Sequence, residues 1–486
     1  MTYILLPAAL GLAGLYLRHV NTAMKKTPEE ALHLSPHRWT IEEVKAAYEK
    51  ASESPVDVTK SLPPKQTRRY IVVGGSGLVG GWIVQHLLSR GEDPSAIRIL
   101  DLHTPTKEVL DLGVTFVKTN ITDKLSVDTG FEQPWPESIA DLPLTVFHTA
   151  AIIRPQDRLE VFLPLCSNVN VEGTRNVVNA AKESGATCFI STSSGSVGLH
   201  RPDFWIAPWE TLPKRVTQIW SDDAPVPQRH DEFFGNYAVT KVEAERLVRS
   251  EDNLSSNFRT GCIRPANGIY GIGSDVAMTI TGVYLRTGGS PTWLNPIIQS
   301  FVNAENVSIA HLLYEQRLVE QSKPGSQLPN IGGQAFVVTD PNPAISFSDV
   351  YTLLVTLAKT PIAFPVVQPI YLFLLAYVIE AYSFVQFKYL SWLLPKITGD
   401  LAQVQPSLFA ISDTCVFADD SRAKKSPEEG GLGYNPPLTT LDGMCKEVLH
   451  WNKNAVANGV VVDEKIGPVR VTENGVDVNL VAPGKI

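Results

Sequence analysis

Short apolar runs alternate with segments of helical spacing through the middle of the chain. Five of these runs read as strands, and they lie at 70–73, 96–101, 113–123, 144–152 and 186–194. The segments 82–91 and 169–185 between them have the spacing of helices. Parallel strands that are joined by helices are covered on both faces. The pattern therefore predicts an α/β fold built on a doubly wound parallel sheet.

Two further apolar stretches lie outside this alternation. Residues 1–17 carry no charge and are followed by basic residues within 18–26. This favours a membrane anchor over residues 1–26 that leaves the rest of the protein on the cytosolic side, with a buried core helix as the alternative. Residues 360–395 are apolar and aromatic but contain several prolines. They favour an element that dips into the membrane interface, with a pair of buried helices as the alternative.

A glycine-rich turn directly follows the first strand. Gly74 permits a tight turn, Gly77 lets the backbone approach a pyrophosphate, and Gly80 lets the next helix pack closely. The N-terminus of that helix then offers free N–H groups to a phosphate. The second strand ends at Asp101, where an acid accepts a hydrogen bond from a ribose 2′-OH. No Lys or Arg occupies the next three positions, so the sequence favours NAD over NADP.

Composition narrows the choice of function. The net charge is −8 with no basic block, which makes nucleic acid an unlikely partner. The five cysteines form no CxxC pair and no metal-binding spacing, so we expect reduced core thiols and no metal. We expect five regions: the anchor at 1–26, a stalk at 27–67, a nucleotide-binding domain at 68–271, a smaller C-terminal substrate lobe at 272–451 and a tail at 452–486.

A set of motifs in fixed order carries a family resemblance. They are GGSGLVG (74–80), HTAA (148–151), NVEGT (170–174), STSSGSV (191–197), YAVTK (237–241) and IRPANGIYG (263–271). The set resembles the extended short-chain dehydrogenases/reductases, whose nucleotide domain is a Rossmann fold. Within them it is similar to the 3β-hydroxysteroid dehydrogenase/isomerase family, which includes sterol-4α-carboxylate 3-dehydrogenases. The resemblance covers about residues 68–451.

The YAVTK motif places Tyr237 and Lys241 on one helix face. A nearby ammonium lowers the pKa of a tyrosine, so Tyr237 is the predicted general base. Ser194 ends the predicted fifth strand and is predicted to orient the substrate oxygen, although Ser193 is only one residue away. The resemblance implies Asn170 as the fourth catalytic residue, and a helix cap is the alternative for it.

The resemblance also implies a set of cofactor contacts. These are Gly74, Gly75, Ser76, Gly77, Leu78, Val79, Gly80, Asp101, Asn120, Ile121, Thr149, Ala150, Ala151, Tyr237, Lys241 and Pro265. The family often has aspartate where this chain has Asn120. The segment 200–230 is long and rich in aromatic residues, which predicts a lid or pocket wall, with a small satellite core as the alternative.

Together these features predict an NAD-dependent oxidoreductase that oxidises a 3β-hydroxyl on a sterol or terpenoid. One form of this prediction is a substrate with a 4α-carboxylate that is lost as CO2, as in C-4 demethylation in sterol biosynthesis. A dehydrogenase/isomerase of a steroid or specialised terpenoid and a non-catalytic NAD-binding membrane adaptor are the alternatives. We expect the endoplasmic reticulum membrane as the location and membrane lipid as a partner. A homodimer or a sterol-biosynthesis complex is left open.

Overall fold

The computed structural model describes residues 2–273, 279–457, 470–472 and 475–477. Its largest element is a seven-stranded sheet of order β11-β7-β5-β4-β1-β2-β3, in which all neighbours are parallel. The strands are β1 (Arg69–Val73), β2 (Ile97–Asp101), β3 (Thr115–Lys118), β4 (Leu144–His148), β5 (Ala186–Thr192), β7 (Arg259–Pro265) and β11 (Gln334–Val338). The five strands predicted from the sequence are therefore confirmed, and so is the doubly wound arrangement.

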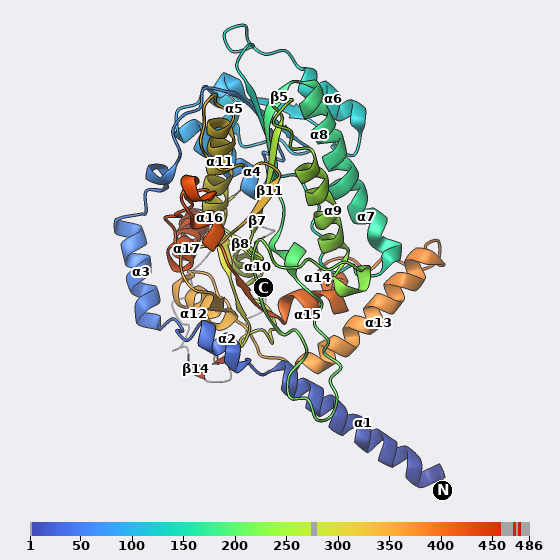
Figure 1. Cartoon of the computed structure of the whole chain (residues 1–486). Coiled ribbons are helices and arrows are strands. Elements are labelled where there is room, and N and C mark those ends of the chain that lie inside the picture. The colour runs from blue at the N-terminus through green and yellow to red at the C-terminus, as the bar shows by residue number, and fades with distance from the viewer. Residues whose placement is uncertain (1, 274–278, 458–469, 473–474, 478–486) are drawn as a thin grey trace.

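Successive residues of β1 point into different cores. Tyr70 and Val72 belong to the apolar cluster on one face of the sheet, whereas Ile71 and Val73 belong to the cluster on the other. Helices lie on both sides of the sheet (Figure 1). They are α4 (Leu78–Ser89), α5 (Lys107–Asp111) and α11 (Ala304–Gln321) on the first face, and α6 (Lys124–Glu132), α8 (Thr174–Glu183) and α9 (Asn236–Ser250) on the second. The short α7 (Leu163–Ser167) packs on α9.

A smaller lobe is built around a four-stranded sheet of order β12-β9-β13-β6 and a pair of strands, β8 and β10. Its strands are β6 (Thr217–Trp220), β8 (Gly268–Tyr270), β9 (Ile298–Gln299), β10 (Phe301–Asn303), β12 (Ile345–Ser346) and β13 (Cys415–Ala418). Its helices are α10 (Ile280–Thr287), α12 (Phe347–Leu357), α14 (Asp400–Gln403), α15 (Pro406–Ser412) and α17 (Thr440–Ala457). The short α16 (Ser421–Lys424) packs on β11 instead and contributes Ala423 to the core of the large sheet.

The boundary expected between the two lobes is wrong in two places. The segment 200–230 was expected within the nucleotide domain, but its strand β6 pairs with β13 of the small lobe. Residues 304–338 were expected in the small lobe, but they return as α11 and β11 to the large sheet. The physical reason is pairing: β11 covers the edge of β7, and β6 covers the edge of β13.

Residues 27–67 do not form a free stalk. The helices α2 (Glu29–Leu34) and α3 (Ile41–Glu53) are part of the small-lobe core, where Ala31 and Val44 are fully buried. The capping box predicted for the second of them is present, since Thr40 accepts from the Glu43 N–H and the Glu43 carboxylate accepts from the Thr40 N–H. The apolar stripe of α3 explains the docking, because it packs on α12 and α17.

The helices α1 (Thr2–Met24) and α13 (Pro369–Lys388) pack against one another at one end of the molecule. The first part of α1 extends away from the body (Figure 1). Among the described residues, α13 is the one helix whose length and composition would let it cross a membrane. Most of the tail lies outside the described residues; within it, β14 (Arg470–Thr472) and β15 (Gly475–Asp477) pair antiparallel.

Candidate active site

The glycine turn has the geometry that the sequence requires of it. Gly74 adopts a φ of +84°, a value that residues with a Cβ rarely adopt. A Cβ at Gly80 would collide with the Gly74 carbonyl oxygen, so the first turn of α4 needs glycine there to pack on the strand end. A Cβ at Gly77 would meet only that same carbonyl, at 3.3 Å. The turn therefore leaves bare backbone at the N-terminus of α4, which fits a pyrophosphate.

Asp101 ties the end of β2 to this turn. Its Oδ2 accepts from the Ser76 N–H at 3.1 Å, and its Oδ1 accepts from the His103 N–H at 3.0 Å. The Ser76 hydroxyl donates to the His103 carbonyl oxygen at 2.6 Å. The carboxylate is thus held at the edge of the turn, beside the place where the ribose of a bound dinucleotide would lie.

The other predicted cofactor contacts lie along the same carboxyl edge of the sheet. Thr149 donates its hydroxyl to the Val73 and Gly74 carbonyl oxygens, which braces the loop after β4 against the turn. Ile121 is buried and packs where Gly173 leaves room for it. Asn120 is exposed, and its Oδ1 accepts from the Thr122 N–H and hydroxyl. The remaining contacts lie in the glycine turn, the first turn of α4, the loop after β4 and the end of β7: Gly75, Leu78, Val79, Ala150, Ala151 and Pro265.

The structure brings Ser194 and Tyr237 together. Ser194 follows β5, Tyr237 is in the first turn of α9, and the Ser194 side chain is near enough to the Tyr237 phenol to lower its pKa. The Ser194 hydroxyl also lies 2.8 Å from the Ser196 hydroxyl. Ser193 faces away from them, because its hydroxyl donates to Glu245 Oε2 at 2.6 Å. Of the two serines between which the sequence left the choice open, Ser194 is therefore the one whose side chain lies near Tyr237.

The pKa of Tyr237 differs from the sequence expectation. Burial raises it to about 12, and the hydrogen bond with Ser194 offsets only part of that rise. Lys241 is buried one turn further along α9, and burial lowers its pKa to about 8. Its Nζ donates to the Thr192 carbonyl oxygen at 2.7 Å. The pKa of Tyr237 in the protein alone therefore lies above its usual value and not below it, because burial raises this pKa by more than the Ser194 side chain lowers it.

Residues 71–361, more than half of the chain, match the model of the 3-beta hydroxysteroid dehydrogenase/isomerase family. The chain belongs to this family. The predicted enzyme class is thereby confirmed: an NAD-dependent oxidoreductase that acts on a CH–OH group.

Two curated members of the family illustrate the similarity. A 3-beta-hydroxysteroid dehydrogenase from Mycolicibacterium neoaurum is 29% identical over 57% of this chain and 67% of its own length. A decarboxylating sterol-4-alpha-carboxylate 3-dehydrogenase from Homo sapiens is 27% identical over 57% of this chain and 64% of its own length. The matches thus span about two thirds of each relative.

A solved structure confirms the fold. A UDP-glucose 4-epimerase from Stenotrophomonas maltophila, with NAD bound, superimposes with a TM-score of 0.52 at 16% identity. The match covers 80% of this chain and 99% of the epimerase. At this identity the likeness concerns the Rossmann fold alone.

In this family member Asn170 is not a helix cap. It lies in a π-helical segment (Asn168–Gly173) that precedes α8. Its side-chain amide donates to the Ile152 carbonyl oxygen and to the Thr240 hydroxyl, both at 3.1 Å, and its Oδ1 accepts from the Ile152 N–H at 2.9 Å. Asn170 therefore joins the loop after β4 to the helix that carries Tyr237 and Lys241.

Sequence reasoning missed a buried ion pair beneath the site. Arg264 on β7 donates to both carboxylate oxygens of Glu245, at 2.9 and 2.6 Å. Glu245 follows Lys241 by one helical turn and accepts from Ser193 on its other side. The sequence signal that could have revealed the pair is a charged residue four positions after Lys241, on the same helix face, and a second one inside the apolar run 260–265. The pair fixes the end of β5 against α9, and so it sets the spacing of Ser194 and Tyr237.

Proposed function

We propose that this protein oxidises the 3β-hydroxyl of a sterol or related terpenoid at a membrane surface. The observation that carries the proposal is the proximity of Ser194 and Tyr237, with Lys241 one turn along the same helix, and Ser194 follows a strand of the same parallel sheet as the strand that precedes the glycine turn. A bound NAD supplies the hydride acceptor. The bare backbone of the turn and the Asp101 carboxylate provide a site of suitable chemistry for it.

Four residues of the chain have distinct roles in the proposed reaction. Ser194 donates its hydroxyl hydrogen to the substrate oxygen and holds it in place. Tyr237, as phenolate, takes the proton of the substrate hydroxyl while the hydride leaves the carbon that bears this hydroxyl. The Lys241 ammonium stabilises the phenolate from one turn away. Asn170 holds α9 at the correct distance from the loop after β4.

If the substrate carries a 4α-carboxylate, oxidation yields a β-keto acid, which loses CO2 without further catalysis. The similarity to a decarboxylating dehydrogenase supports this substrate class, and the similarity to a 3-beta-hydroxysteroid dehydrogenase supports the simpler alcohol. The deciding experiment measures NADH formation with matched 3β-hydroxysterols that differ only in the 4α-carboxylate. Turnover of neither sterol would overturn the proposal.

A membrane location is part of the proposal. Leu6, Leu10, Leu12 and Leu15 of α1 are between 65% and 69% exposed, which is costly in water. The exposed face of α13 lies at the same end of the molecule (Figure 1). We place the protein at the endoplasmic reticulum membrane with the catalytic domain in the cytosol. Protease added to sealed vesicles should cut that domain, and its protection would contradict the orientation.

A further inference from the structure

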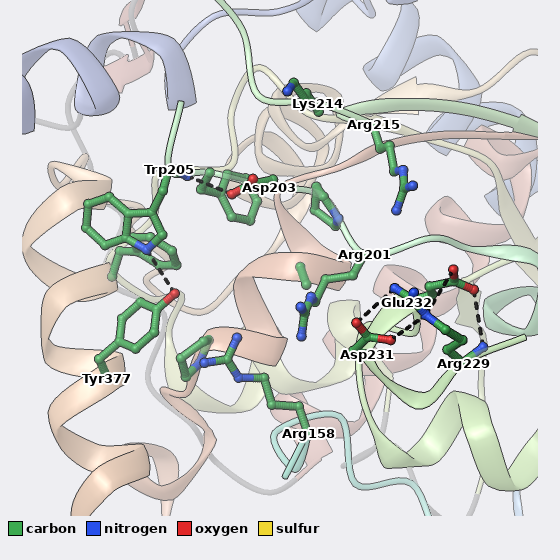
Figure 2. Close-up of a pocket in the computed structure, with 15 residues that line it drawn as sticks. Arg158, Arg201, Asp203, Trp205, Lys214, Arg215, Arg229, Asp231, Glu232 and Tyr377 are labelled. Atoms are coloured by element: carbon green, nitrogen blue, oxygen red, sulfur yellow. Dashed lines mark hydrogen bonds and ion pairs between the residues drawn. The ribbon is translucent and has the colours of Figure 1, made fainter. Parts of the chain in front are cut away.

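A pocket of about 440 Å³ lies between the inserted segment and α13, outside the residues proposed to carry the reaction. Phe204 and Trp205 from the insertion and Phe373 and Tyr377 from α13 form its apolar side. The Trp205 indole N–H donates to the Tyr377 hydroxyl at 3.0 Å, which joins the two elements (Figure 2). Its other side is basic and carries Arg158, Arg201, Lys214, Arg215 and Arg229.

Three of these cations already have partners. Arg158 makes a bidentate ion pair with Glu380, at 2.6 and 2.8 Å. Lys214 lies 3.3 Å from Glu210. Arg229 is paired with two acids that also line the pocket, Asp231 and Glu232. The third lining acid, Asp203, accepts from the Trp205 N–H at 3.1 Å.

Arg201 and Arg215 are the two remaining basic residues of the pocket lining. Within the described part of the chain, neither guanidinium has an ion pair or hydrogen bond. Figure 2 shows the side chains of Arg201 and Arg158 extending toward one another, although both are cations. Arg215 adopts a φ of +62°, a conformation that is uncommon for a residue with a side chain. The pocket lining thus contains two unpaired guanidinium groups, and each presents the planar fork of N–H donors that suits an oxyanion.

The surroundings of the pocket point to the source of that anion. Trp205 stacks on Tyr16 of α1, with ring centroids 6.3 Å apart, and the Tyr16 hydroxyl donates to the Ile206 carbonyl oxygen at 3.0 Å. The pocket therefore lies at the base of the exposed apolar part of α1. Trp209 (83% exposed) is in the same insertion, and such aromatic residues are enriched at membrane interfaces.

We infer that this pocket binds the phosphate group of an anionic phospholipid through Arg201 and Arg215. The inference rests on the membrane location proposed above but not on the proposed reaction. The bound headgroup would fix the insertion and α13 at the depth of the membrane surface. An inorganic phosphate ion has the same chemistry, and the experiment separates the two sources.

The test uses the full chain in neutral detergent micelles. Thermal unfolding is followed while phosphatidic acid, phosphatidylcholine or inorganic phosphate is added, since a ligand of the folded state raises the midpoint. We expect phosphatidic acid to stabilise the protein more than either of the others. In Arg201→Gln/Arg215→Gln, its apparent affinity should fall about 30-fold, since each basic residue near an anionic headgroup contributes about a fivefold effect.

Two further variants make the result specific. Lys118→Gln/Arg175→Gln removes the same charge from exposed positions on other elements and should respond to phosphatidic acid as the wild type does. Arg201→Lys/Arg215→Lys keeps both charges without the planar fork, so it should fold and lose about tenfold in affinity.

Three outcomes would overturn the inference. The first is an unchanged response in both Arg201/Arg215 variants. The second is an equal loss in the Lys118/Arg175 control. The third is stabilisation by inorganic phosphate with no added effect of phosphatidic acid, which would assign the pocket to a soluble anion. Sterol oxidation is measured in the same micelles, so failure of the proposed reaction is recorded separately from failure of lipid binding.

Discussion

Strand β4 and helix α13 are both built from apolar sequence, yet the fold uses them in opposite ways. Every residue of β4 is buried. In α13, Phe373 and Ala376 are buried, while Val378 is 65% exposed and Tyr371 is 72% exposed. Apolar composition alone therefore does not tell a core element from a surface one. The difference is that other elements pack over both faces of β4, whereas one face of α13 has no element packed on it in the described structure.

The two regions also divide the functions. The sheet and its loops hold the residues proposed for chemistry, and they are fixed by buried hydrogen bonds such as that of Ser193 with Glu245. The pair α1 and α13 holds no residue proposed for chemistry and leaves apolar side chains uncovered. If the division is real, each region can be damaged without harm to the function of the other. The predictions below test this separation.

The largest effect is expected for Tyr237→Phe, which removes the proposed base. The rate of oxidation should fall about 10²–10⁴-fold, the usual contribution of a general base. NAD binding, followed by fluorescence titration, and membrane partitioning should stay near those of the wild type, since the ring keeps its packing. Near-normal turnover would show that another group takes the proton.

Changes to the helices α1 and α13 should have the opposite effect: they should weaken membrane binding and leave the reaction intact. In a chain lacking residues 1–26, replacing Leu374, Leu375 and Val378 by Ser removes exposed apolar area worth about 1 kcal/mol each. Partitioning into phosphatidylcholine vesicles should then fall about 100-fold relative to the truncated parent, with turnover in detergent unchanged.

Ile379→Ala is the matched control, because Ile379 is buried on the same helix and does not line the pocket described above. It should lower the free energy of unfolding by about 2–5 kcal/mol instead of releasing the protein from vesicles. If deletion of residues 1–26 alone makes the protein fully soluble, the exposed face of α13 does not bind membrane.

The pH dependence of the oxidation rate should report the ionisation of Tyr237 and Lys241. Oxidation needs Tyr237 deprotonated and Lys241 charged, and their pKa values are about 12 and about 8. The population of that state rises tenfold per pH unit up to about 8. Above that value the gain in phenolate is offset by the loss of ammonium, so a plot of log kcat/KM against pH should become flat. The two apparent pKa values describe the titration of Tyr237 and Lys241 together, and neither value belongs to one residue alone.

Lys241→Arg should remove the plateau if the variant is active, because arginine keeps its charge over this range. Its rate should continue to rise where that of the wild type levels off. A wild-type rate that falls steadily from neutral pH upward would contradict the assignment of Tyr237 as base.

The sequence predicted the two regions unequally well. The sheet followed from the apolar runs, because a parallel strand needs cover on both faces and its composition records that need. The contact of Tyr237 with Ser194 followed from motif order. The pairing of β6 with β13 did not follow, because four residues of ordinary composition carry no mark of a partner almost 200 residues away. The docking of α3 was missed although its apolar stripe and capping box were visible in the sequence.

The smallest effect is expected at the cofactor edge of the core. Asp101→Asn leaves one carbonyl oxygen where two carboxylate oxygens now accept from the Ser76 and His103 N–H groups. It also removes the negative charge of the carboxylate that would accept a hydrogen bond from the ribose hydroxyl. The KM for NAD should rise about tenfold, equivalent to one charged hydrogen bond of about 1.4 kcal/mol, and the preference over NADP should narrow. Asp111→Asn, at an exposed position on α5, is the matched control and should leave both values unchanged. Initial rates with the two cofactors decide the matter: a wild type that works faster with NADP, or an Asp101→Asn variant with an unaltered KM for NAD, would show that this carboxylate only braces the glycine turn. Membrane partitioning should be the same in all three proteins, because the Asp101 carboxylate bonds to Ser76 and His103 and Asp111 is on α5, so neither change alters an apolar side chain of α1 or α13.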